Sequence, residues 1–193
     1  MIEKLYNWMM KQAESKNSVR VLSLVSFIES SFFPFPPDPV LAIVVAKNKD
    51  KALYYALICT ITSVLGGFLG YYIGYAFFET IGSSIITYYG QLENFEKFAA
   101  ELNKWAFWLI CAKGLTPIPY KIVTIASGLA KIDLCTFGIA SLITRSMRFL
   151  LLSCICKVFG EKVLAFIEKY KKISLFLIIA SIIVGFLLVK LLV

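Results

Sequence analysis

The feature that most constrains this chain is an uninterrupted apolar segment, residues 52–78, which contains no charged side chain. As a helix, these residues would extend for about 40 Å at about 1.5 Å per residue, more than the ~30 Å hydrocarbon core of a bilayer. Hydrophobic residues make up 59% of the 193-residue chain and charged residues only 17%, too few to cover a soluble core. We therefore predict an all-α integral membrane protein.

Other segments fit the same plan. Two further apolar stretches are long enough to span a bilayer, and a polar connector separates the first spanning helix from the second half of the chain. The first residues place apolar and basic side chains on different helix faces, which suits the membrane interface. We divide the chain into an interfacial segment (1–18) and a single membrane domain (19–193), with spanning helices at 52–78, 134–158 and 173–189 and a polar connector at 79–104.

Prolines interrupt two more apolar segments, residues 19–46 and 105–130. Proline removes a backbone donor and moves the preceding residue out of helical geometry, so no straight helix passes through such a cluster. Two half-length apolar arms around a proline turn indicate a re-entrant hairpin, which enters and leaves the membrane on one side. The residues that shape these hairpins are Pro34, Pro36 and Pro37 in the first, and Pro117 and Pro119 in the second.

Loop charges set the orientation. Residues 47–51 and 157–172 are rich in lysine, whereas the connector at 79–104 is mainly acidic. By the positive-inside rule the lysine-rich loops are cytosolic, as is the N-terminus. The two hairpins then enter from opposite sides of a multi-pass protein. Each is followed by a spanning helix, so the chain reads as an inverted-topology repeat, an architecture typical of secondary transporters.

Away from their ends, the predicted membrane segments contain six charged residues, and isolated charges at such depth are costly and usually functional. The repeat sets Asp38 opposite Lys121, so that an acidic hairpin tip meets a basic one and forms a site at the membrane midplane. In the alternative reading, the charges only pair and lock the hairpins together. Arg145 and Arg148 lie three apart on one helix face and suit either a phosphate-bearing ligand or the hairpin carboxylates. The candidate site residues are Glu29 and Asp38, Lys113 and Lys121, and Arg145 and Arg148.

Three glycines, Gly66, Gly70 and Gly74, recur every four residues within the first spanning segment. This spacing places them on one helix face, where the missing side chains let another helix approach closely. They are predicted to be packing residues.

Several function classes are disfavoured. The chain has no histidine, which removes Ser-His-Asp and Cys-His nucleophile systems and HExxH zinc chemistry. Its five cysteines lie in apolar runs without CxxC spacing and read as small buried hydrophobes. The net charge of +8 collects at segment ends, where it sets topology and does not indicate nucleic acid. We expect no metal, no cofactor and no enzymatic activity.

Four motifs occur in order along the chain: "ESSFFPFPPDP", "SVLGGFLGYYIG", "KGLTPIPYKIVTIASG" and "TRSMRF". Together they resemble the DedA superfamily of bacterial membrane proteins, also called the VTT or SNARE-associated domain, in its YqaA-like branch, over about residues 25–165. The resemblance implies opposed re-entrant hairpins in the bacterial inner membrane and the transport or scrambling of lipids, with some members moving polyprenyl phosphates in a proton-linked manner. It also implies that Glu29 and Asp38 respond to protons. Lys113 and Lys121 stand near positions where other members carry arginines, which grip phosphate bidentately as lysine does not.

The favoured hypothesis is a proton-coupled transporter or scramblase of anionic, phosphate-bearing lipids. In it the headgroup binds Lys113, Lys121, Arg145 and Arg148 while an acid changes protonation. A small-ion or proton-coupled solute transporter is one alternative, because carboxylates and free helix-end carbonyls also suit cations. A non-transporting membrane assembly factor is another. The expected partners are membrane lipids, and the sequence is also compatible with a homo-oligomer.

Overall fold

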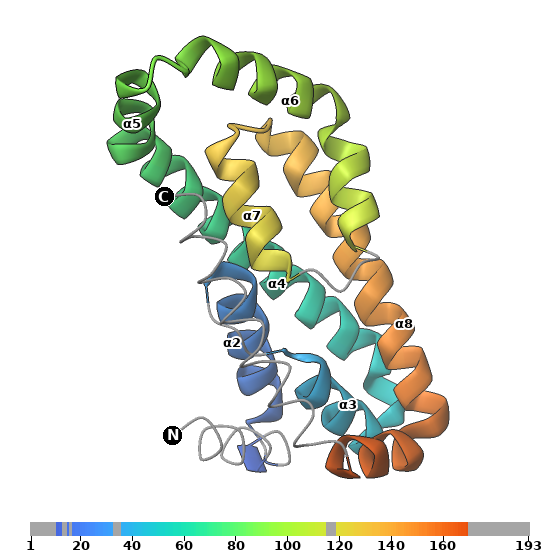
Figure 1. Cartoon of the computed structure of the whole chain (residues 1–193). Coiled ribbons are helices and arrows are strands. Elements are labelled where there is room, and N and C mark those ends of the chain that lie inside the picture. Colours follow the sequence, from blue (N-terminus) through green and yellow to red (C-terminus); the bar gives the residue numbers. More distant parts are fainter. Residues whose placement is uncertain (1–10, 13–14, 16, 33–35, 115–118, 170–193) are drawn as a thin grey trace.

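The computed structural model describes residues 11–12, 15, 17–32, 36–114 and 119–169 (Figure 1). In these residues every regular element is helical, as predicted. The elements are α2 (Ser18–Ser31), α3 (Asp38–Lys47), the 3-10 turn η1 (Lys49–Lys51), α4 (Ala52–Phe77), the π-helical turn η2 (Phe78–Gly82), α5 (Ser83–Tyr88), α6 (Leu92–Gly114), α7 (Tyr120–Leu129) and α8 (Leu134–Lys169).

Two helical stretches in the described part of the chain are long and apolar enough to cross a membrane. They are Lys49–Tyr88, which contains α4, and Leu134–Gly160, which forms most of α8. The backbone of α8 leaves helical geometry at Phe159 (φ −114°, ψ 24°), and its last part turns across the end of the molecule (Figure 1). These helices fit a membrane protein. The predicted span at 173–189 lies outside the described residues, as does most of the interfacial segment.

Two pairs of helices, α2–α3 and α6–α7, reverse the direction of the chain. In Figure 1, α2 rises from the lower end and α3 descends, whereas α6 crosses the upper end and descends in its last part, and α7 rises again. Prolines stand at both reversals: Pro37 is the N-cap of α3 and Pro119 the N-cap of α7. Pro36 precedes Pro37 and is partly buried, while Pro34 and Pro117 lie outside the described residues. Proline suits these positions because the first helical turn leaves its N–H groups unpaired.

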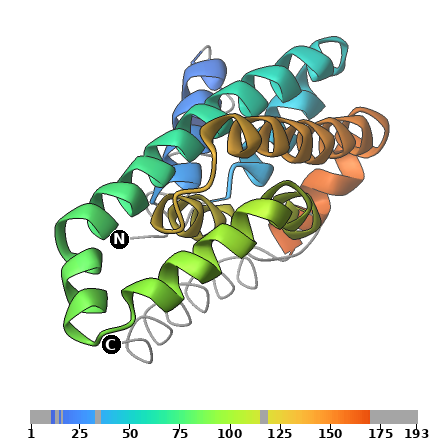
Figure 2. The ribbon, with the colours of Figure 1, turned by 90° about the horizontal axis from the view of Figure 1, so that it is seen from above.

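Helix α6 runs without interruption from Leu92 to Gly114. The sequence analysis placed a boundary between a polar connector and the second hairpin at residues 104 and 105, inside this helix. No proline or glycine occurs between Leu92 and Lys113, so nothing in the backbone ends the helix where polarity changes. The connector and the first arm of the second pair therefore form one element (Figure 2).

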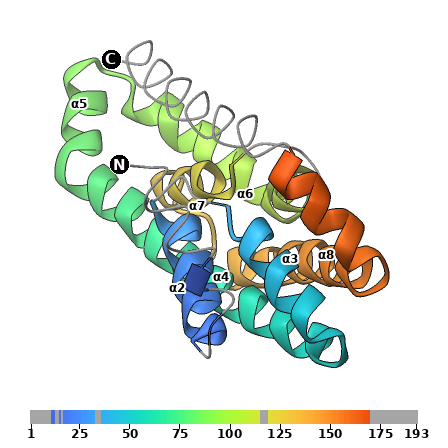
Figure 3. The same cartoon turned by 90° about the horizontal axis from the view of Figure 1, so that it is seen from below.

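The glycines of α4 are the points where two other helices touch it. A Cβ added at Gly66 would lie less than 3.0 Å from the backbone of Phe27 in α2. One added at Gly74 would collide in the same way with the backbone of Ile125 in α7, and at Gly70 with the Thr124 side chain. The stripe thus brings α2 and α7 onto neighbouring parts of α4 (Figure 3).

The turn before α8 is closed by an N-cap. Asp133 Oδ2 accepts the backbone N–H of Thr136 at 2.8 Å, and this hydrogen bond lowers the pKa of the Asp133 carboxyl group. Because the folded-state pKa lies below the unfolded one, the contribution is present above the ordinary pKa of aspartate and is lost as pH falls through the folded value.

We expect Asp133→Ala to lower the thermal unfolding temperature of the detergent-solubilised protein at pH 7, because the cap is lost. Asp133→Asn, which can still cap the helix, should stay close to wild type at pH 7. The deficit of Asp133→Ala should shrink at strongly acidic pH. An alanine variant as stable as wild type at pH 7 would show that this cap contributes nothing.

Candidate functional site

A buried arginine lies where α2, α4 and α8 meet. Arg145, near the middle of the apolar part of α8, places Nη2 2.7 Å from Glu29 Oε2 on α2 and donates from Nε to Ser63 Oγ on α4 at 2.6 Å. The Arg145 side chain is only 7% exposed and that of Glu29 only 14%. A pair this deeply buried is stable only with good geometry and further hydrogen bonds, because both charges leave water.

Two serines complete those hydrogen bonds. Ser30 Oγ accepts from Arg145 Nη2 at 3.1 Å and lies 2.7 Å from Ser63 Oγ. The single hydroxyl proton of Ser30 has two acceptors, the Ser26 carbonyl at 2.8 Å and Glu29 Oε2 at 3.2 Å. Ser63 therefore supplies the proton between the two serines, and accepts from Arg145. The hydroxyl groups of Ser30 and Ser63 thus each donate one hydrogen bond and accept at least one.

Aromatic rings flank the guanidinium group. Arg145 Cζ lies 4.1 Å from the centroid of the Tyr120 ring, at the start of α7, and 5.2 Å from that of Phe149, one turn further along α8. Rings at these distances attract the cation through their electron-rich faces. Through Tyr120, helix α7 of the second helix pair also contacts Arg145.

A second ion pair lies closer to the surface. Arg148 Nη2 is 2.5 Å from Oδ2 of Asp38, the first residue of α3, and the two side chains are 43% and 29% exposed. A carboxylate at a helix N-terminus is further favoured by the helix dipole. The other oxygen, Asp38 Oδ1, is buried without a hydrogen-bond partner in the described residues. The outer pair therefore combines a partly accessible guanidinium with an unused acceptor.

Of the two lysines of the second helix pair, only Lys121 can be compared with the sequence expectation. Lys121 is half-buried on α7 and forms no ion pair with a carboxylate among the residues that the structure describes. Asp38, which the repeat alignment set opposite Lys121, pairs with Arg148 instead. Lys113 falls in α6, but its side chain is outside the described residues. Both hairpin acids thus take arginines from α8 as partners.

Sequence reasoning missed Ser30, Ser63 and Tyr120. A signal for the serines was available: Ser26 and Ser30 stand four apart in α2, and Ser63 is a polar residue within the apolar segment that forms α4. Polar residues on one face of an apolar helix indicate a polar neighbour. No such signal identified Tyr120, because tyrosine is common at membrane interfaces.

The site offers charge and hydrogen bonding without a nucleophile paired to a base. Within the described ranges no group of three Asp, Glu, Cys or His side chains could hold a metal ion. The guanidinium of Arg148 is 43% exposed and is a group that binds carboxylates and phosphates. A charged centre between apolar helices of this kind is a candidate functional site of a membrane protein.

Comparison with known proteins identifies the family. Residues 33–158 match the VTT domain, and the chain belongs to this family, the DedA superfamily. Proteins of the family are membrane-associated and are generally proposed to be transporters or flippases. An uncharacterized protein of Haemophilus influenzae is 29% identical over 186 residues, 96% of each chain. A protein of Histophilus somni described as an uncharacterized HI0703 homolog is 33% identical over 159 residues, 82% of each chain. No solved structure matches the chain.

Proposed function

We propose that this protein moves anionic, phosphate-bearing lipids, such as a polyprenyl phosphate or a phospholipid, across the membrane. The observation that carries the proposal is the half-exposed Asp38–Arg148 pair beside the buried Glu29–Arg145 pair. A phosphate can replace Asp38 at Arg148, since both are oxyanions that accept two guanidinium hydrogen bonds. Lys121, without a carboxylate partner in the described residues, lies on the helix that contacts Arg145 and adds positive charge.

The proposal includes a topology. The helix pairs α2–α3 and α6–α7 act as two re-entrant hairpins inserted from opposite sides, in an inverted repeat, with the N-terminus in the cytosol of a bacterial inner membrane. The opposed directions of the pairs and the lysine-rich stretch at 47–51 support this arrangement. The motifs quoted above favour the YqaA-like branch of the family.

Protons would drive the exchange of partners. When Asp38 or Glu29 takes up a proton, its arginine loses an ionic partner and binds phosphate more strongly. The unpaired Asp38 Oδ1 is an atom on which such a proton could reside. No covalent step is needed, so we propose a transporter and not an enzyme.

The test is flux of a labelled polyprenyl phosphate in proteoliposomes. We expect Arg148→Gln to reduce the flux by at least about tenfold, because a hydrogen bond to a charged group contributes about 1.5–3 kcal/mol. Arg148→Lys should retain part of the flux, since lysine contacts phosphate at a single point. Lys97→Gln is the control, because Lys97 pairs with Glu93 on the surface of α6.

The double variant Asp38→Asn, Arg148→Gln removes both charges and separates lost binding from the effect of an unpaired acid. If it is folded and moves the lipid at the wild-type rate, the outer pair does not bind the headgroup. Proton uptake by wild-type vesicles without any lipid movement would instead favour a proton-coupled solute transporter.

A further inference from the structure

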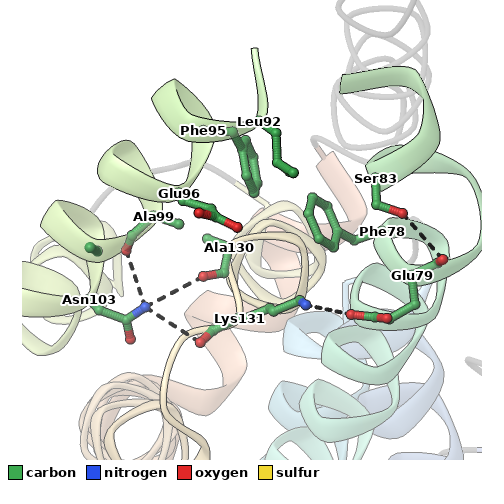
Figure 4. Close-up of a pocket in the computed structure, with 11 residues that line it drawn as sticks. Phe78, Glu79, Ser83, Leu92, Phe95, Glu96, Ala99, Asn103, Ala130 and Lys131 are labelled. Atoms are coloured by element: carbon green, nitrogen blue, oxygen red, sulfur yellow. Dashed lines mark hydrogen bonds and ion pairs between the residues drawn. The ribbon is translucent and has the colours of Figure 1, made fainter. Parts of the chain in front are cut away.

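Away from the charged site, a pocket of about 360 Å³ lies between η2 and the start of α5, the first half of α6 and the turn that joins α7 to α8 (Figure 4). Its lining includes the rings of Phe78 and Phe95, which stack with centroids 4.9 Å apart. The carboxylates of Glu79 and Glu96 line it too. Phe78 and Glu79 belong to the π-helical turn η2, and such turns frequently occur at functional sites.

The pocket already holds one ammonium group, that of Lys131. Lys131 Nζ forms an ion pair with Glu79 and lies 4.8 Å from the centroid of the Phe78 ring and 5.6 Å from that of Tyr75. The hydrogen bond with the Glu79 carboxylate raises the pKa of Lys131, so the amine stays charged at neutral pH. Carboxylates combined with aromatic faces are the chemistry by which proteins recognise organic ammonium ions.

The pocket contains a second carboxylate, that of Glu96. Glu96 lines the same pocket and forms no ion pair within the described part of the chain. Lys131 neutralises the charge of Glu79. The charge of Glu96 therefore makes the pocket negative by one unit. A negative pocket with aromatic walls favours a monovalent organic cation over an anion.

The remaining polar groups around the pocket are already engaged. The side-chain amide of Asn103 donates to the carbonyl groups of Ala99, Ala130 and Lys131, and its oxygen accepts the N–H of Asp133 at 3.0 Å. These bonds fix the turn between α7 and α8 to α6. Glu96 is thus the charged group of the lining that remains available to a ligand.

We propose that this pocket binds an organic ammonium group, with its positive charge beside Glu96 and its methylene or methyl groups against Phe95. The inference goes beyond lipid movement at the Arg145 and Arg148 site and does not depend on it. The ammonium group could belong to a soluble amine or to the headgroup of a lipid, and the chemistry of recognition is the same.

The test uses the full-length protein purified in detergent. Choline chloride is titrated by calorimetry, and adducts of short-chain phosphatidylethanolamine, with phosphatidylglycerol for comparison, are counted by native mass spectrometry. We expect Glu96→Gln to weaken the binding of the ammonium probe at least about tenfold, because a charge-assisted contact is lost. Glu93→Gln, one turn away and paired with Lys97 outside the pocket, should bind like wild type.

A second variant changes binding in the opposite direction. Lys131→Met removes the internal ammonium group and leaves Glu79 unpaired, so the affinity for the probe should rise. Loss of choline binding in Glu96→Gln indicates a soluble amine as the ligand, and loss of phosphatidylethanolamine adducts alone indicates a lipid headgroup. The proposal is overturned if wild type binds neither probe, or if both affinities are the same in wild type, Glu96→Gln and Lys131→Met.

Discussion

Replacing Arg145 with alanine is expected to lower the free energy of unfolding by about 3–5 kcal/mol, the range for breaking a buried ion pair by removing one partner. Glu29, only 14% exposed, would lose its guanidinium partner, and Ser63 would lose a donor at 2.6 Å. The rings of Tyr120 and Phe149 would also lose the cation that they flank. Unfolding in mixed micelles with increasing SDS measures the effect.

Matched variants separate lost charge pairing from lost volume. Arg148→Ala should cost about 1 kcal/mol or less, because its pair with Asp38 is partly exposed and screened by solvent. The double variant Glu29→Gln, Arg145→Met should be clearly more stable than Arg145→Ala, since neither charge remains buried. Equal stability of Arg145→Ala and Arg148→Ala would show that the inner pair is not the buried centre described above.

The helical class followed from the sequence because it rests on averages over many residues. The uncharged stretch at 52–78 contains all of α4 and extends one residue beyond it, and the prolines stand where the chain reverses before α3 and α7. Composition and backbone geometry dictate such features locally. The point at which a helix ends is harder to predict from the sequence. Helix α6 continues through the change of polarity at residue 104 because no proline or glycine interrupts its backbone there.

The partners of the charged residues could not be derived in the same way. The repeat aligned Asp38 with Lys121, but an alignment fixes position along a helix and not rotation about its axis. Rotation is set by close packing, here by Gly70 and Gly74 of α4 against α7. The sequence left two options for Arg145 and Arg148, a ligand or the hairpin acids, and the structure shows both arginines paired with those acids.

The largest packing effect is expected at Gly74. A methyl group there would lie less than 3.0 Å from the backbone of Ile125, and a backbone cannot move aside as a side chain can. We expect Gly74→Ala to lower the free energy of unfolding by about 1–3 kcal/mol, the range for overpacking. Alanine favours a helix over glycine by about 1 kcal/mol, so a net loss can only come from the contact with α7.

Gly138→Ala in α8 is the control, since its added methyl group would meet chiefly the end of the Phe68 ring, at 3.0 Å, and a ring can shift. Because α7 also carries Tyr120 against Arg145, displacing α7 should disturb the charged site as well as the packing. Gly74→Ala should therefore reduce lipid flux even where the protein remains folded. A variant with wild-type stability and flux would mean that α7 does not approach α4 through this glycine.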